Sequence, residues 1–154
     1  MTEMIAIGDQ FPTSKLALSG DRSLDLGALD GPAVLYFYPK DGTSTCTIQA
    51  RQFNLAVPDY KAAGVTLVGV SVDDDESHRC FADDEGLQFP LLADPGGVLT
   101  KQVGLMKDYG DFGNLAERVT LLLDQNAVVR GVWSPQEQDL TDHPGQVLDA
   151  AKAL

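Results

Sequence analysis

Residues 33–46 have the sequence AVLYFYPKDGTSTC, in which six apolar or aromatic residues are followed by a polar turn and a cysteine. The run from Ala33 to Tyr38 predicts a β-strand that is buried on both faces, because a strand with one wet face would alternate apolar and polar residues. Pro39 is expected to end this strand, since proline has no backbone N–H for a sheet hydrogen bond.

A helix is predicted directly after the polar turn. Apolar residues recur there at steps of three and four, as on one face of a helix, at Ala50, Phe53 and Val57. We expect the helix to run from Cys46 to about Val57, with Pro58 just past its end. Cys46 lies four residues before Ala50 and therefore belongs to the same inward face.

The rest of the chain continues this alternation of strands and helices. Residues 65–72 predict a second buried strand, and the run 73–76 supplies capping and first-turn residues for a helix that ends at Gly86. Further strands are predicted over 15–18, 89–92, 117–123 and 128–133, a helical turn over 97–103, an irregular stretch over 104–114 and a final helix over 144–154. The 154 residues are enough for one core, so we expect a single α/β domain over 1–154.

Acidic residues outnumber basic residues by 23 to 11, which gives a net charge of −12. This charge repels phosphate backbones and anionic lipid head groups, so nucleic acids and membranes are poor partner candidates. The start of the chain lacks a basic segment followed by an apolar run, and no stretch reaches the roughly 18 apolar residues of a spanning helix. A cytoplasmic location is the resulting expectation.

Cys46 falls in the first turn of its predicted helix, where unpaired backbone N–H groups and the helix dipole stabilise a thiolate. Thr43, three residues earlier, offers a hydroxyl that can reach back toward the sulfur. A thiolate beside hydrogen-bond donors is suited to attack a polarised O–O bond, because the departing oxygen needs stabilisation. Judged on position alone, the competing interpretation is that Cys46 is a small buried hydrophobic residue.

The pattern Pro-x-x-x-Thr-x-x-Cys, formed by Pro39, Thr43 and Cys46 after an aromatic strand, resembles the active-site signature of peroxiredoxins. The Tyr-Pro-Lys-Asp opening and the compact length are most similar to the bacterioferritin-comigratory or PrxQ-type branch. Other parts of the resemblance lie in residues 7–12, 117–120 and 132–133. The resemblance to peroxiredoxins implies a thioredoxin-like α/β fold, with a central mixed β-sheet flanked by helices.

The resemblance also assigns roles to individual residues. Cys46 would be the peroxidatic cysteine, oxidised to a sulfenic acid by hydrogen peroxide or an organic hydroperoxide. Thr43 would hydrogen-bond the peroxide and the thiolate, and Pro39 would shield the sulfenic acid from solvent. Arg118, on a strand expected beside the loop, would supply a fixed positive charge. This chemistry needs no metal and no organic cofactor.

Two features depart from that branch. Ser44 and Thr45 stand where Pro-Gly is common, which leaves the loop backbone less restricted but keeps the backbone donor next to the cysteine. A common subset also carries a resolving cysteine five residues after the first, and Arg51 occupies that place here. A resolving thiol on this helix is therefore excluded.

Cys80, on the predicted helix after the second buried strand, is the other candidate, and another subset of the branch resolves from this helix. A disulfide requires the two Cα atoms to approach within about 7 Å. Two thiols on different helices are not expected to meet this condition in the folded, reduced protein. We therefore predict local unwinding of both segments and an intramolecular Cys46–Cys80 disulfide. The alternative is that Cys80 is a packing residue at the margin of its helix.

Three functional classes follow. The first is a thiol peroxidase that is re-reduced by thioredoxin, glutaredoxin or a similar dithiol protein, with a one-cysteine enzyme resolved by an external thiol as its close variant. The second, a dithiol oxidoreductase, is disfavoured because Cys46 lacks the second thiol of a Cys-x-x-Cys motif. The third is a non-enzymatic peroxide sensor.

The sequence also allows expectations about metal binding and oligomeric state. His78 could ligate a metal with Cys80, but no paired Cys-x-x-Cys accompanies it and His143 is far along the chain, so a structural zinc site is not expected. We expect both histidines to be solvated. A monomer is expected, because no apolar stripe forces a dimer, and a weak dimer stays open.

Overall fold

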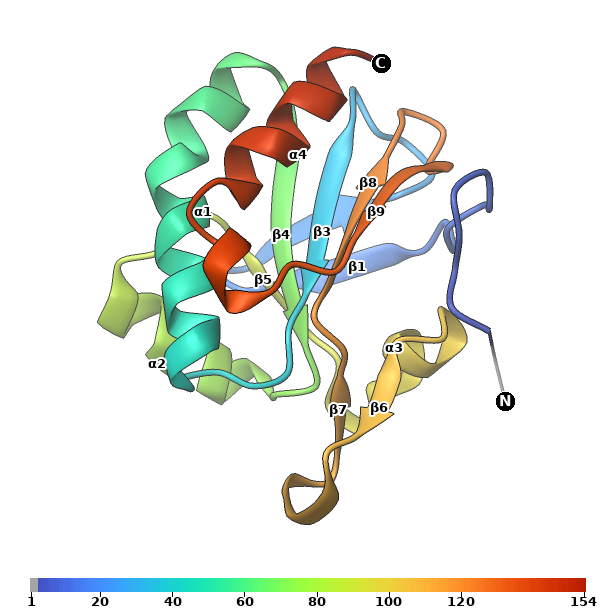
Figure 1. The fold of residues 1–154 in the computed structure, drawn as a ribbon. Helices are drawn as coiled ribbons and strands as arrows, with labels where there is room; N and C mark the ends of the chain where they lie inside the picture. Colours follow the sequence, from blue (N-terminus) through green and yellow to red (C-terminus); the bar gives the residue numbers. More distant parts are fainter. Residues whose placement is uncertain (1–2) are drawn as a thin grey trace.

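The structure is a computed structural model that describes residues 3–154, so the first two residues of the predicted domain lie outside the described residues. Within this range a five-stranded sheet forms the centre, in the order β5-β4-β3-β8-β9 (Figure 1). Neighbours β3–β4 and β4–β5 are parallel, whereas β3–β8 and β8–β9 are antiparallel. The strands are β3 (Ala33–Phe37), β4 (Thr66–Ser71), β5 (Leu91–Ala93), β8 (Val119–Leu123) and β9 (Val129–Trp133). The predicted mixed sheet is confirmed.

Helices and a hairpin cover the two faces of the sheet. The helices α1 (Ser44–Ala62), α2 (Asp75–Glu85) and α4 (His143–Lys152) contribute to the core on one face. The core on the other face is covered by three elements and the residues next to them. These elements are β1 (Lys15–Leu18), β2 (Arg22–Asp25) and α3 (Val98–Gln102). Figure 1 shows α1 and α4 together in front of the sheet and β1 behind it.

Strand β3 joins the two cores, as its uninterrupted apolar sequence predicted. All five of its residues are buried. Leu35 and Phe37 point into the core beneath the β1–β2 hairpin, and Tyr36 points into the core beneath α1 and α4. The period-2 alternation of a strand therefore gives each core a share of the same segment.

Helix α1 is longer than predicted, because it continues through Pro58 to Ala62. Proline inside a helix removes one backbone hydrogen bond and costs about 3 kcal/mol. Tyr60, in the turn that contains Pro58, is buried and donates its hydroxyl to the carbonyl of Pro144 at 2.8 Å. We infer that this packing against α4 offsets the cost of the proline, which sequence periodicity does not reveal.

The stretch predicted to be irregular contains a second hairpin, of β6 (Met106–Asp108) and β7 (Asn114–Ala116). In Figure 1 it extends from the body of the molecule below the sheet. Strand β8 then begins at Val119, two residues later than predicted, so Arg118 lies in the link between β7 and β8 and not on a strand. The remaining short turns are η1 (Pro95–Gly97), η2 (Gly110–Phe112) and η3 (Glu137–Asp139).

Helix α2 begins and ends as predicted. Asp74 caps it by accepting a hydrogen bond from the amide of Ser77 at 2.9 Å. Gly86 ends it in the left-handed conformation, with φ of 61°, which glycine adopts without strain. No helix within residues 3–154 combines the length and the apolar character needed to cross a lipid bilayer.

The expectation that both histidines are solvated is wrong. His78 has no exposed surface and His143 is 2% exposed. Nε2 of His143 lies 2.8 Å from the hydroxyl of Thr120, which belongs to β8. Each buried imidazole therefore has a hydrogen-bond partner within the protein in place of water. These partners are distant in sequence, so the local sequence does not reveal that the histidines are buried.

The buried His143 is expected to make the fold sensitive to acid. Burial lowers the pKa of His143 to about 4, from an ordinary value of 6.5. The unfolded chain therefore binds more protons than the folded chain between these values, so stability falls as the pH drops from about 6.5 to about 4. The linked loss is about 3 kcal/mol. Urea denaturation at pH 7 and pH 4 would measure how far the free energy of unfolding falls between the two pH values. We expect this fall to be about 3 kcal/mol smaller in His143→Gln than in the wild type. Equal falls in the two proteins would contradict the lowered pKa of His143.

Candidate active site

The loop between β3 and α1 places a thiol in the first turn of a long helix. Thr43 precedes the helix with extended backbone angles, φ −74° and ψ 155°. The amide of Thr47 donates to the carbonyl of Thr43 at 2.9 Å. The amides of Ser44, Thr45 and Cys46 come before this first helical bond, so their N–H groups have no acceptor within the helix. The predicted position of Cys46 is confirmed to within the first turn.

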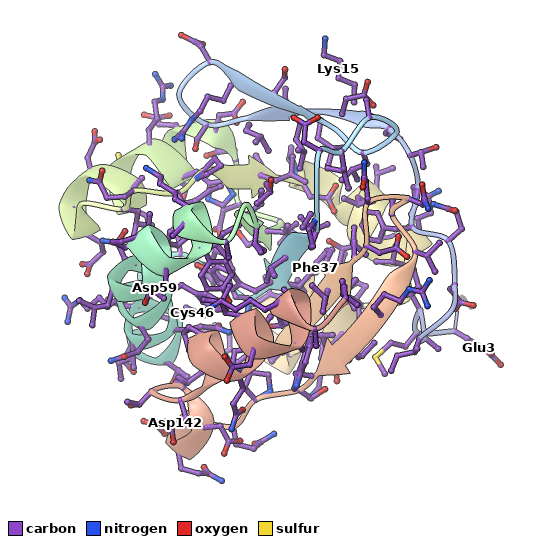
Figure 2. All side chains as sticks on the ribbon, turned by 90° about the horizontal axis from the view of Figure 1, so that it is seen from above. Glu3, Lys15, Phe37, Cys46, Asp59 and Asp142 are labelled. Atoms are coloured by element: carbon purple, nitrogen blue, oxygen red, sulfur yellow. The ribbon has the colours of Figure 1, made fainter. Side chains whose placement is uncertain are left out.

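Cys46 is directed into the protein and is 1% exposed. Figure 2 labels it on α1, on the side where side chains gather between that helix and the sheet. Its sulfur accepts a hydrogen bond from Nη2 of Arg118 at 3.3 Å. The two residues are 72 positions apart in sequence, and the sheet brings them together because β8 pairs with β3 directly beneath the loop.

Gln49 is a site residue that the sequence interpretation missed. It is 1% exposed, and its Oε1 accepts a hydrogen bond from Nη1 of Arg118 at 2.6 Å. One guanidinium therefore contacts the thiol with one nitrogen and this amide with the other, which fixes its plane. A polar residue three positions after Cys46, on the predicted inward face, was the available signal.

Two further polar atoms are buried beside the thiol region, and neither has a hydrogen-bond partner within the described residues. They are the hydroxyl of Tyr36 and Nε2 of Gln49. Burial, reinforced by the neighbouring Asp41 carboxylate, raises the pKa of Tyr36 well above its ordinary value. Its ring stacks on Phe53 with the centroids 4.4 Å apart. The inner wall of the site is therefore aromatic and uncharged.

Thr43 and Pro39 lie in the loop as the sequence placed them. The hydroxyl of Thr43 is exposed and donates to the carbonyl of Lys40 at 2.9 Å. A contact of this hydroxyl with the sulfur or with a peroxide stays a prediction. Pro39 is half-buried, and its shielding role stays a prediction as well.

Cys80 lies on the outer side of α2. It is exposed, while His78 and Phe81 of the same helix are buried. Within the part of the chain that the structure describes, both cysteines are free thiols. The buried Cys46 and the exposed Cys80 therefore occupy different surroundings, as expected for the reduced protein.

Arg51 occupies the place that holds a resolving cysteine in a common subset of the resembling branch. Here it forms an ion pair with Glu85, at the end of α2. Next to this pair, Asn54 donates to the carbonyl of Gly86 at 3.0 Å and accepts from the amide of Gln88 at 2.7 Å. Arg51 and Asn54 on α1 therefore bind the C-terminal end of α2. This part of α1 has no thiol that could resolve a sulfenic acid.

A buried polar cluster adjoins the loop. Asp41, Asp73 and His78 offer oxygen and nitrogen atoms that all lie within 4.8 Å of one another, a spacing that a metal ion could use. Donors from the protein already occupy these oxygens, since Asp41 accepts from Tyr38 and His78, and Asp73 accepts from Ser71. Both oxygens of Asp41 and Oδ2 of Asp73 therefore already accept hydrogen bonds from protein donors.

These features define a class of protein. A thioredoxin-like sheet carries a buried thiol in the first turn of a helix, and an arginine donates to that thiol. Fixed positive charge and backbone donors around a sulfur nucleophile are the requirements for peroxide reduction by a thiol. The class is that of the thiol peroxidases.

Comparisons with known proteins identify the family. Residues 7–132 match the AhpC/TSA family. Chloroplastic peroxiredoxin Q of Triticum aestivum is 37% identical over 97% of this chain and 68% of its own length. The solved structure of a PrxQ mutant from Xylella fastidiosa is 30% identical, with a TM-score of 0.85 over 99% of this chain and 98% of that one. The chain therefore belongs to the AhpC/TSA family of peroxiredoxins, in the PrxQ and bacterioferritin comigratory protein subfamily.

A third similar protein concerns activity. The bacterioferritin comigratory protein of Xanthomonas campestris was solved in trapped intermediate and ligand complexes that address its alkyl peroxide reduction activity. It is 32% identical, with a TM-score of 0.82 over 96% of this chain and 98% of that chain. The resemblance predicted from the loop is thus confirmed, and this chain is a thiol peroxidase of the PrxQ type.

Proposed function

We propose that Cys46 is the peroxidatic residue of this thiol peroxidase. Its thiolate attacks one peroxide oxygen, an S–O bond forms and the O–O bond breaks. The second oxygen takes a proton and leaves as water or as an alcohol, and Cys46 becomes a sulfenic acid. The observation that carries this proposal is the 3.3 Å hydrogen bond from Arg118 to the buried sulfur.

The surrounding residues support this step in different ways. The guanidinium of Arg118 favours the anionic form of the sulfur and offers donors to charge that develops on the departing oxygen. Gln49 holds this guanidinium in place. Thr43 would donate to the bound peroxide after its hydroxyl turns from Lys40, and Pro39 would limit access of solvent to the sulfenic acid.

We further propose that Cys80 resolves the sulfenic acid. The sequence contains two cysteines, so a disulfide within one chain can use no other thiol. The Cys80 sulfur attacks the sulfur of Cys46, an S–S bond forms and water leaves. Since Cys46 is buried and Cys80 is exposed, both helix segments must unwind locally before the sulfurs meet.

The substrate and the reductant follow from the same chemistry. We propose hydrogen peroxide and alkyl hydroperoxides as substrates, supported by the activity named for the protein from Xanthomonas campestris. A dithiol protein such as thioredoxin or glutaredoxin would exchange with the Cys46–Cys80 disulfide, taking up the oxidising equivalent and restoring both thiols. A single domain over 1–154, a monomeric state and a cytoplasmic location belong to the same proposal.

The test is a map of sulfur linkages after oxidation. We would treat the reduced protein with one equivalent of hydrogen peroxide and analyse non-reducing peptides by mass spectrometry, with Cys46→Ser and Cys80→Ser alongside. The expected product in the wild type is a Cys46–Cys80 bridge within one chain. Cys80→Ser is expected to hold a sulfenic acid on Cys46, because the first step does not need the second thiol.

Other products would select the alternatives. A sulfenic acid on Cys46 of the wild type, with Cys80 untouched, would contradict resolution by Cys80 and favour a one-cysteine peroxidase. Fast formation of that acid, with no turnover in the presence of a dithiol, would favour a peroxide sensor. A Cys46 that stays reduced would overturn the whole proposal.

A further inference from the structure

The loop between β3 and α1, which leads to Cys46 and is called the Cys46 loop below, is tied to α2 through the carboxylate of Asp41. This side chain is 5% exposed and accepts three hydrogen bonds. Tyr38, at the end of the β3 segment, donates to Oδ1 at 2.6 Å. Ser77 and His78, both on α2, donate to Oδ2 at 2.8 Å and 2.7 Å. The carboxylate therefore joins the loop to the first turn of the helix that carries Cys80.

The backbone of Asp41 is held as well. Its amide donates to Oδ2 of Asp73 at 2.8 Å, and the same oxygen accepts from the hydroxyl of Ser71 at 2.6 Å. Asp73 lies between β4 and α2. The loop is thus anchored at its midpoint by both main chain and side chain, to residues that lead into α2.

The partners of His78 determine its protonation. Nδ1 faces the carboxylate of Asp41, and Nε2 lies 3.0 Å from the backbone carbonyl of Leu92 on β5. Both partners are acceptors, so both ring nitrogens must donate, which only the imidazolium can do. Asp41 and His78 therefore form a buried ion pair.

The groups that face His78 from each neighbouring element agree with this charge. Asp41 comes from the loop, Asp73 from the link before α2, the carbonyl of Leu92 from β5 and the ring of Tyr38, 6.4 Å away, from the end of the β3 segment. Burial alone lowers the pKa of the imidazole, but the hydrogen bond and charge of Asp41, the carbonyl of Leu92 and the charge of Asp73 outweigh it and raise the pKa.

We propose that Asp41 and His78 are positioning residues that latch the Cys46 loop to α2, and that this latch must open before Cys80 can reach Cys46. The proposal deepens the proposed function and rests on Cys80 as the resolving residue. His78 lies two positions before Cys80, and Asp41 lies five before Cys46. The latch thus joins the two segments that have to move. Removing either partner leaves the other charge buried and uncompensated, which favours the open state.

The latch affects the two chemical steps in opposite directions. Oxidation needs the closed loop, because there the sulfur of Cys46 contacts Arg118. Disulfide formation needs the open loop. A weaker latch should therefore slow the first step, speed the second and shorten the time in which a second peroxide can convert the sulfenic acid to a sulfinic acid. General loss of stability would not produce this opposite pair of changes.

The variant that tests the latch is Asp41→Asn, which keeps the shape of the side chain and removes its charge. The matched control is Glu85→Gln, which removes the ion pair between α1 and the far end of α2 without touching the loop. Rapid-mixing experiments with hydrogen peroxide would measure the rates of Cys46 oxidation and of Cys46–Cys80 bridge formation. We expect Asp41→Asn to form the bridge about fivefold faster and to oxidise about twofold more slowly, which is the result of raising the opening equilibrium constant by one decade, from about 0.1 to about 1. Glu85→Gln should match the wild type.

A second readout does not depend on disulfide chemistry. In a Cys80→Ser background, hydrogen exchange of peptides that cover residues 39–46 and 75–80 reports opening of the latch directly. We expect Asp41→Asn, and His78→Gln if Asp41→Asn does not fold, to lose protection in both segments together. Protection in the His78-containing chain should also fall as pH rises through the raised pKa of His78, and His78→Gln should lack this dependence.

These readouts separate failure of the latch from failure of the proposed function. Unchanged bridge formation and unchanged exchange in Asp41→Asn would overturn the latch even if the wild type forms the disulfide. A wild type that forms no bridge would contradict resolution by Cys80, and with it the coupling to resolution stated here. Exchange in the Cys80→Ser background would then still decide whether Asp41 holds the loop to α2.

Discussion

Cys46→Ser is expected to abolish peroxide consumption, with activity falling to that of buffer that contains reductant alone. A serine hydroxyl at this place is not ionised near neutral pH, and it is a far weaker nucleophile than a thiolate. No other group contacted by Arg118 in the described structure can attack an O–O bond, since its second partner is the amide of Gln49. The loss of activity would be measured by following the peroxide concentration over time, with dithiothreitol as the reductant.

The matched control is Cys80→Ser. It removes the exposed thiol and leaves Cys46 and Arg118 in place. We expect it to consume its first equivalent of peroxide as fast as the wild type. Serine is nearly isosteric with cysteine, so thermal unfolding of both variants should resemble that of the wild type. Peroxide consumption by Cys46→Ser at the wild-type rate would show that another residue does the chemistry.

Arg118→Met is expected to lower the rate constant for Cys46 oxidation by about 100-fold, or roughly 2.7 kcal/mol in the barrier. Methionine keeps much of the length of arginine but offers neither charge nor N–H donors. The sulfur would lose the hydrogen bond that now spans 3.3 Å, in a place where burial denies it water. Loss of a donor from a site that stabilises developing negative charge has effects of this size. Single-turnover peroxide consumption at several peroxide concentrations gives the rate constant.

Gln49→Leu is the companion to that experiment. It removes the 2.6 Å contact that orients the guanidinium but retains the charge of Arg118. A smaller effect is expected, about tenfold, because a mobile arginine still contacts the thiol part of the time. If Arg118→Met and Gln49→Leu both oxidise at the wild-type rate, the guanidinium serves packing and does not support the reaction.

Much of the fold could be predicted because its signals are local. The apolar run that became β3 has no polar residue to place in water, and the Asp74 cap and Gly86 stop of α2 act within a few residues of the helix ends. Pro58 shows the limit of such reasoning. Its cost is local and visible in sequence, whereas the compensation is the packing of Tyr60 against α4, far along the chain.

Some residues of the candidate active site could likewise be predicted from the sequence, and others could be found only in the structure. The helix start predicts a reactive thiol at Cys46 from sequence alone, and the family resemblance adds Arg118 as its partner. Gln49 and the Asp41–His78 pair required the folded chain, because buried polar residues are explained by partners that only the tertiary structure supplies. A polar residue on a buried helix face, such as Gln49 or His78, is the sequence signal that such a partner exists.

The most direct test of the central claim is chemical trapping at Cys46. Reduced Cys80→Ser protein would be mixed with one equivalent of hydrogen peroxide and a dimedone-type probe, which reacts with sulfenic acids, and then digested for mass spectrometry. We predict that the probe adds to Cys46 in nearly all chains and that the peroxide is consumed. An unlabelled, reduced Cys46 together with unreacted peroxide would contradict the assignment of Cys46 as the peroxidatic residue.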